Sequence, residues 1–168
     1  MIKKDDYAVF GKLLIDIQFL ETLIKLYISY FKPEIKKKNG ITGLNSKSIL
    51  DDTDGSRKTL GALMKILNSN IEEFKNEEFK ELLEKRNIFA HNLHKEYLSV
   101  KANKENDLTN FISRLSHLVK KYTDIFTGLH SITIKSLSKG KVSTKGIEQS
   151  ETELYNYLEK LKDSKYAR

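Results

Sequence analysis

Two long stretches of the chain carry apolar residues at steps of three and four, which is the spacing of one face of an α-helix. They run from 6 to 31 and from 107 to 132. In the first stretch these residues are Tyr7, Phe10, Leu13, Leu14, Ile17, Leu20, Leu23, Ile24, Tyr27, Ile28 and Phe31. The only proline, Pro33, follows the first stretch and interrupts neither. We expect two long helices that pack together as the spine of an all-α bundle.

Shorter amphipathic segments complete the pattern. We expect a short helix from 59 to 69 and a longer one from 78 to 97. Ser56 and Asn76 are their candidate N-caps, and Ser150 is the candidate N-cap of a last helix. The predicted fold is therefore an all-α bundle of four long helices and one shorter helix.

Two segments lack helical periodicity. Residues 32–58 are rich in Lys, Asn, Gly, Ser and Asp, and residues 133–150 are rich in Lys, Ser and Gly, so we predict that both are mobile loops. At the start of the second segment, residues 132–134 are Ile, Thr and Ile, and this β-branched composition is typical of a strand. Nothing divides the chain into separate domains, so we expect one domain over residues 1–168.

Composition narrows the classes of function. The net charge is +7, and the basic excess lies in the outer thirds of the chain, which favours a polyanionic partner. The chain has no cysteine, so it has neither disulfides nor thiolate metal sites, and we expect a cytoplasmic protein. It has no apolar run of the length that a membrane span needs, so we expect no membrane partner.

The segment 78–97 breaks its own pattern at one position. Its apolar stripe consists of Phe79, Leu82, Leu83, Ala90 and Leu93. Arg86 falls near the middle of that stripe, and Asn87, His91 and His94 lie along its flank. A guanidinium in an apolar seam needs a partner charge or access to water. Such departures are typical of functional sites.

Two explanations without catalysis remain open for these residues. In the first, Arg86 pairs with an internal acid such as Glu34 or Asp124, and His91 is a packed neighbour. In the second, His91 and His94 bind a metal ion together with Glu84. Two histidines and one acid at helical spacing are common by chance, so we assign no metal site.

The sequence from Arg86 to His91, Arg-Asn-Ile-Phe-Ala-His, resembles the signature of the HEPN superfamily. That signature is an arginine and a histidine separated by four to six residues, often with a polar residue directly after the arginine. The long first helix, the helix near 59–63 and the acid-rich approach Glu81–Lys85 resemble the same family. The resemblance covers roughly residues 6–130.

The resemblance implies a metal-independent endoribonuclease without a cofactor, acting as a homodimer in which two motifs face each other. Members of this family are commonly toxins or effectors of phage defence, so an antitoxin or another regulatory protein is an expected partner. RNA brings its own nucleophile, the 2′-hydroxyl, next to the scissile phosphate. Arg86 would bind the phosphate, and His91 would transfer protons, because imidazole changes protonation near neutral pH. Asn87 would either orient the imidazole or hold a non-bridging phosphate oxygen.

Other residues are candidates for contact with RNA outside the motif. His94 follows the motif on the same helix. Lys135, Lys139, Lys141 and Lys145 lie in the basic segment that we predict to be a loop.

In one respect the chain departs from the family. Many toxin members carry, two residues after the histidine, a tyrosine that a partner nucleotidyltransferase modifies. Here Leu93 occupies that position, and the nearest tyrosine is Tyr97. The departure argues against neutralisation by such a modification, although Tyr97 lies about one turn further along the same helix. An antitoxin that acts by simple binding stays open. The rival function is that of a non-catalytic, dimeric helical adaptor protein.

Overall fold

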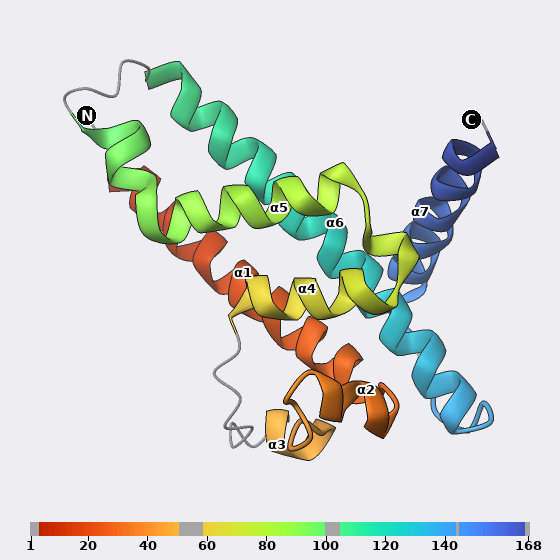
Figure 1. The fold of residues 1–168 in the computed structure, drawn as a ribbon. Helices are drawn as coiled ribbons and strands as arrows, with labels where there is room; N and C mark the ends of the chain where they lie inside the picture. Colours follow the sequence, from red (N-terminus) through yellow and green to blue (C-terminus); the bar gives the residue numbers. More distant parts are fainter. Residues whose placement is uncertain (1–3, 51–58, 100–104, 144, 167–168) are drawn as a thin grey trace.

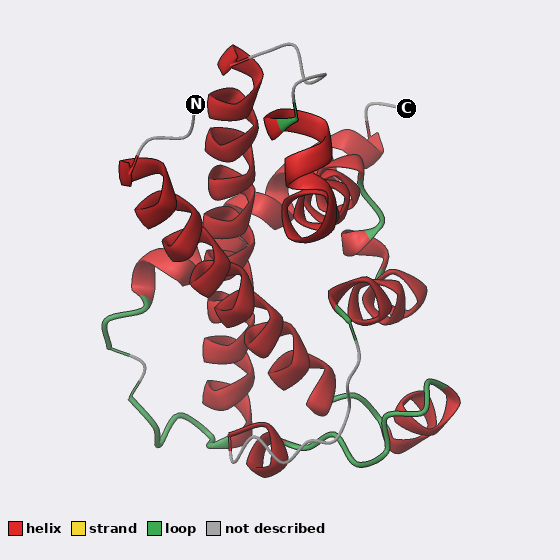
Figure 2. Ribbon diagram, turned by 90° about the vertical axis from the view of Figure 1, so that its left-hand side faces the viewer, coloured by secondary structure: helices red, strands yellow, loops and turns green. Residues whose placement is uncertain are grey.

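The computed structural model describes residues 4–50, 59–99, 105–143 and 145–166. Within these ranges every regular element is helical and no strand occurs (Figure 2). The prediction of an all-α fold is therefore confirmed. None of the described helices has both the length and the hydropathy to cross a membrane.

The helices follow the order shown in Figure 1. They are α1 (Lys4–Ser29), α2 (Pro33–Lys38), α3 (Ser46–Leu50), α4 (Leu60–Asn70), a 3₁₀ turn η1 (Glu72–Phe74), α5 (Glu77–Asn87), the π-helical segments η2 (Ile88–Asn92) and η3 (His94–Leu98), α6 (Glu105–Leu137) and α7 (Glu148–Tyr166).

The two long helices α1 and α6 lie side by side, and α4 and α5 cross them on one face (Figure 1). The Tyr27 ring of α1 lies 5.8 Å from the Phe126 ring of α6 in an edge-on contact. Further along, Nε2 of His130 lies 2.8 Å from the backbone oxygen of Leu23. The predicted spine is therefore present.

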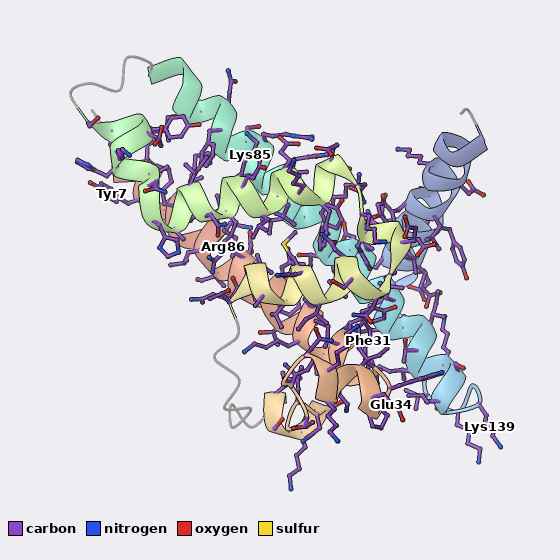
Figure 3. All side chains as sticks on the ribbon, in the orientation of Figure 1. Tyr7, Phe31, Glu34, Lys85, Arg86 and Lys139 are labelled. Carbon is purple, nitrogen blue, oxygen red and sulfur yellow. The ribbon has the colours of Figure 1, made fainter. Side chains whose placement is uncertain are left out.

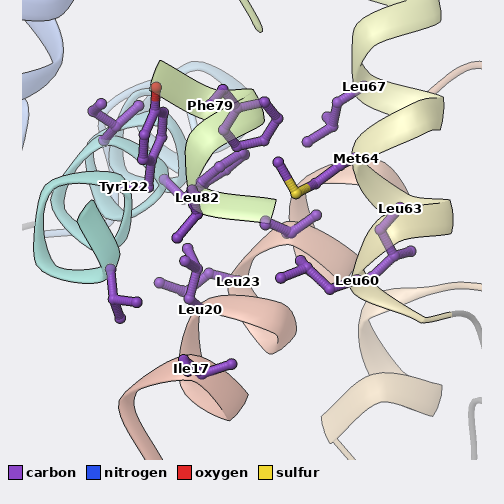
Figure 4. Packing of buried hydrophobic residues seen from close by; sticks show 14 of the residues in the cluster. Ile17, Leu20, Leu23, Leu60, Leu63, Met64, Leu67, Phe79, Leu82 and Tyr122 are labelled. Carbon is purple, nitrogen blue, oxygen red and sulfur yellow. The ribbon is translucent and has the colours of Figure 1, made fainter. Parts of the chain in front are cut away.

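The core is closed by α5 and α4 over this spine (Figure 4). Phe79, in the first turn of α5, is fully buried and packs against the rings of Tyr122 and Phe74 at 4.8 and 5.1 Å. Met64 of α4 is buried beside them. Because Phe79 is held on several sides, the start of α5 is fixed in position relative to α6.

A buried hydrogen-bond network fixes the same end of α5. Oδ1 of Asn76 accepts from the backbone N–H of Phe79 at 2.9 Å, which confirms the predicted N-cap, and from the Tyr122 hydroxyl at 3.2 Å. Its Nδ2 donates to the Tyr157 hydroxyl at 2.8 Å, which in turn donates to the backbone oxygen of Glu73 at 2.6 Å. Burial raises the pKa of Tyr157 to about 12 and also raises that of Tyr122. One side chain therefore joins α5, α6 and α7.

Replacement of Asn76 by alanine is expected to lower the free energy of unfolding by about 2 kcal/mol, because it removes the cap and leaves two buried hydroxyls short of a partner. The matched control is Thr59→Ala. Thr59 caps α4 by accepting one hydrogen bond from the Ala62 N–H, so we expect its removal to lower the free energy of unfolding by about 1 kcal/mol. Urea unfolding measures both, and equal losses would contradict a role for the tyrosine contacts.

The end of α6 differs from the sequence-based prediction. The helix continues to Leu137, so residues 132–134 are helical and the prediction of strand character was wrong. The segment between α6 and α7 is correspondingly shorter than the predicted loop 133–150, and its described residues are 138–143 and 145–147. The Thr133 hydroxyl donates to the Leu129 backbone oxygen at 2.7 Å, so the hydroxyl of this β-branched residue has a hydrogen-bond partner inside the helix.

The predicted N-caps at Ser150 and Ser56 are not observed as caps in the described residues. α7 begins at Glu148, so Ser150 lies inside it and the predicted cap was wrong. Instead, a side-chain oxygen of Glu148 accepts from the Gly146 N–H at 2.8 Å. Ser56 lies outside the described residues, and the observed cap of α4 is Thr59. The described part of the predicted loop 32–58 contains the short helices α2 and α3.

Candidate active site

The helix that carries the motif changes its hydrogen-bonding pattern inside the motif. Regular α5 ends at Asn87, and the chain continues as the π-helical segments η2 and η3. Ile88 and Leu93 keep right-handed helical dihedrals, so the helix widens without breaking. The prediction of a single regular amphipathic helix from 78 to 97 was wrong in this respect.

The wider turn alters which side chains share a face. In an α-helix, five steps of about 100° set two residues roughly 140° apart. Where hydrogen bonds run from residue i to i+5, the rotation falls to about 80° per residue. Only the last three of the five steps from Arg86 to His91 lie in the π-helical segment, so the two residues end roughly 80° apart. The π-helical segment therefore moves His91 around the helix toward the side of Arg86. Such segments occur frequently at functional sites.

The same change redirects the apolar stripe. Ala90, which the α-helical pattern places in the stripe, is exposed, so that expectation was wrong. Ile88 and Phe89 pack against the core instead, and the Phe89 ring lies 6.2 Å from the Phe10 ring of α1. The contact of Phe89 with Phe10 places the π-helical segment against α1.

Arg86 is paired with a carboxylate of α1. Its Nη2 and Nε lie 2.7 and 3.2 Å from the same oxygen, Oε1 of Glu21. Both side chains are largely covered, with 17% and 22% of their surface exposed. The acid is neither of the two that the sequence suggested: Asp124 pairs with Lys120 on α6, and Glu34 lies in α2.

The pairing leaves part of the guanidinium available. Nη1 also donates to Oδ1 of Asn87, at 3.4 Å. A guanidinium has five N–H groups. Glu21 and Asn87 take three of them, and no described residue accepts the remaining N–H on Nη1 or on Nη2. Arg86 therefore keeps two N–H groups that no described residue occupies.

The histidines of the motif segment face solvent. His91 and His94 are both exposed, as is Asn87. The alternative in which His91 is a packed neighbour inside the bundle was therefore wrong. In the described part of the chain, no three or more His, Asp or Glu side chains are arranged to hold a metal ion.

The remaining histidines lie on α6. His117 is exposed, whereas His130 is buried against α1. Burial lowers the pKa of His130, so its imidazole stays neutral where an exposed one would begin to protonate. Neither residue belongs to the helix that carries the motif.

The four lysines that were candidates for RNA contact do not form one group. Lys135 lies within α6 and donates to Glu151 of α7 at 2.5 Å, and this contact lowers the Glu151 pKa. Lys139, Lys141 and Lys145 lie between α6 and α7 and are exposed. Figure 3 shows Lys139 at the lower right tip of the molecule, well away from Arg86. This basic loop is therefore remote from the motif.

Sequence reasoning missed Glu21. It is the only acid between residues 17 and 33, a stretch dominated by apolar side chains. That isolation was the available signal, because a lone acid on a core helix requires a partner.

Comparison with models of protein families, with curated proteins and with solved structures finds no match to this chain.

Glu21→Gln is expected to lower the free energy of unfolding by about 1 to 2 kcal/mol, because it removes the countercharge of a largely covered guanidinium while keeping the side-chain shape. The control is Glu72→Gln, which removes a more exposed partner of Lys75. Chemical unfolding of the two variants checks this. A Glu21→Gln protein as stable as the control would mean that the pair contributes nothing to the fold.

Proposed function

We propose that this protein is a metal-independent endoribonuclease of the HEPN type, in which Arg86 and His91 act on one phosphate of a bound RNA. The observation that supports this most is the π-helical turn between them, which moves an exposed imidazole toward a guanidinium with two uncommitted N–H groups. A purely structural ion pair needs neither feature.

The reaction follows from the chemistry of RNA. The 2′-oxygen attacks the adjacent phosphorus and loses its proton to an imidazole, and the bond from phosphorus to the 5′-oxygen breaks. The departing oxygen takes a proton, which gives a 2′,3′-cyclic phosphate and a 5′-hydroxyl. In this scheme His91 transfers protons, and Arg86 stabilises the charge that develops on the phosphate. Asn87 fixes Nη1 of Arg86 or contacts a phosphate oxygen.

Glu21 acts in this proposal as a positioning residue. By accepting from Nε and Nη2, it fixes the plane of the guanidinium and leaves the outer N–H groups directed away from α1. A rigidly held fork loses less entropy on binding a phosphate than a mobile side chain does.

The exposed surface of α1 next to the motif supports a dimer in which two motifs meet. Tyr7 and Leu14 precede Glu21 at intervals of seven residues, so all three lie on one side of α1. The periodicity places Tyr7 and Leu14 in the apolar stripe, yet both are exposed. Exposed apolar side chains beside a polar site are typical of an interface. The second subunit would supply the second imidazole.

In this proposal the protein is a cytoplasmic toxin or phage-defence effector whose activity a binding partner restrains. The rival proposal is a non-catalytic, dimeric helical adaptor. The contact between Arg86 and Glu21 favours that rival, because it also explains the arginine as part of the scaffold.

The test is incubation of the purified protein with total RNA in excess chelator, alongside Arg86→Lys. Lysine retains a positive charge for Glu21 but not the planar fork, so we expect cleavage by the wild type and a rate about 100-fold lower for the variant. Thermal unfolding of both proteins checks that the fold is kept. If the folded wild-type dimer cuts no RNA, the adaptor proposal is favoured; equal rates would exclude a role for the guanidinium fork.

A further inference from the structure

α1 carries a second exposed stripe, on the other flank of the helix from Glu21. Val9, Lys12, Asp16 and Phe19 follow one another at steps of three, four and three, so they share one face. The stripe lies roughly 160° around the helix from Glu21. Val9 and Phe19 are exposed, and Lys12 and Asp16 form an exposed ion pair between them. We call these four residues the Val9–Phe19 stripe.

The stripe forms one wall of a groove between α1 and α6. The groove has a volume of about 320 Å³. Its α6 wall consists of Ser116, Val119, Lys120 and Thr123. Ile15, with 65% of its surface exposed, lies beside the stripe on α1, and Phe19 is 54% exposed. Large apolar side chains at this level of exposure, grouped along a groove, are typical of a surface that binds another protein.

The order of the residues along the stripe makes it complementary to itself. From one end to the other the side chains are apolar, positive, negative and apolar. A two-fold axis at the level of residue 14 turns a second copy of the stripe antiparallel to the first. Val9 then lies opposite the partner's Phe19, and Lys12 lies opposite the partner's Asp16. Every contact in such an arrangement occurs twice.

We propose that a second copy of this chain docks antiparallel on the Val9–Phe19 stripe. Val9 of each copy then covers Phe19 of the other. Each Lys12 pairs with the partner's Asp16 in addition to Asp16 of its own chain. The reverse, parallel arrangement opposes Lys12 to a second Lys12 and Asp16 to a second Asp16. Opposed like charges disfavour that orientation, so the charges specify the antiparallel one.

This contact does not depend on the proposed ribonuclease activity. Because the stripe lies on the other flank of α1, the docked copy leaves Arg86, Asn87 and His91 uncovered. If dimers also form through the motif face, two different isologous contacts on each chain extend the assembly beyond a dimer. Oligomeric state and RNA cleavage therefore report on separate proposals.

The test exchanges the charges between two proteins. Lys12→Glu and Asp16→Lys are prepared separately, and sedimentation velocity measures the mass of each alone and of an equal mixture. Alone, each variant opposes like charges at both pairs, so we expect its association constant to fall at least about tenfold. In the mixture, each charge meets its opposite on the other chain, so the wild-type mass should return. The ion pair within each chain stays broken in the mixture, so it cannot account for the recovery.

The apolar half of the contact is tested by Phe19→Asp. We expect this variant to lose the contact at the stripe, so that sedimentation velocity gives a lower mass than for the wild type. Tyr155→Asp is the matched control, because Tyr155 is similarly exposed, at 56%, but lies on α7. Thermal unfolding of both variants checks the fold. The proposal is overturned if wild type and Phe19→Asp have the same mass at every concentration, or if the mixed charge variants fail to associate.

Discussion

His91→Ala is expected to lower the rate of RNA cleavage by about 100- to 10,000-fold, the range that positioned acid–base groups contribute. The His91 side chain is exposed, so its removal leaves no cavity and should not change the unfolding midpoint. The loss should appear in the single-turnover rate at saturating RNA, because the imidazole acts in the chemical step and not in binding. A 5′-labelled RNA oligonucleotide provides the measurement.

Two other exposed histidines serve as controls for that variant. His94→Ala removes a candidate RNA contact on the same helix, so we expect weaker binding but a nearly unchanged rate at saturation. His117→Ala alters α6 away from the motif and should change neither quantity. If all three variants cleave at the wild-type rate, His91 is not catalytic. If all three lose activity equally, the effect is on the fold.

Gly128→Val is expected to lower the free energy of unfolding by about 3 kcal/mol or more, which is the largest loss of stability that we predict for a single substitution. Gly128 lies where α6 and α7 cross. A Cβ atom there would meet the Ser150 backbone oxygen at 2.5 Å and Cβ of Leu154 at 3.0 Å. A backbone oxygen cannot move aside without its helix, so α7 must shift and uncover the apolar contacts beneath it.

Urea unfolding followed by circular dichroism measures this loss, with Gly61→Ala as the control. A Cβ atom at Gly61 would lie 3.6 Å from the Leu83 side chain, which is an ordinary contact, and alanine is the better helix former. We therefore expect Gly61→Ala to be neutral or slightly stabilising. If Gly128→Val unfolds at the same urea concentration as the wild type, α7 does not depend on this close approach.

Elements built on local patterns could be predicted from the sequence. The apolar periodicity predicted α1, α4 and most of α6, and Asn76 was identified as a cap from residue type and position. The tyrosines bonded to Asn76 come from α6 and α7, and no local pattern specifies such distant partners. The end of α6 was missed because three β-branched residues in a row outweighed the helical pattern.

The candidate site was predictable only in part, for the same reason. Arg86 could be identified because it violates the stripe of its own helix. Its partner Glu21 precedes it by 65 residues. The isolation of Glu21 signals that it needs a partner, but only the fold shows that this partner is Arg86. The π-helical turn was also out of reach. Within it Ile88 and Phe89 pack against the core, a tertiary arrangement that an ideal helical repeat does not contain.

The most direct test of the proposed chemistry is whether cleavage needs the 2′-hydroxyl of the substrate. Once a cleaved site has been mapped, two oligonucleotides are compared in excess chelator: one entirely ribose, the other with a single 2′-deoxy nucleotide on the 5′ side of the scissile phosphate. We predict that the first yields a 2′,3′-cyclic phosphate and a 5′-hydroxyl and that the second stays intact at that bond. Cleavage of the deoxy-substituted bond, or products with a 3′-hydroxyl and a 5′-phosphate, would contradict attack by the RNA itself.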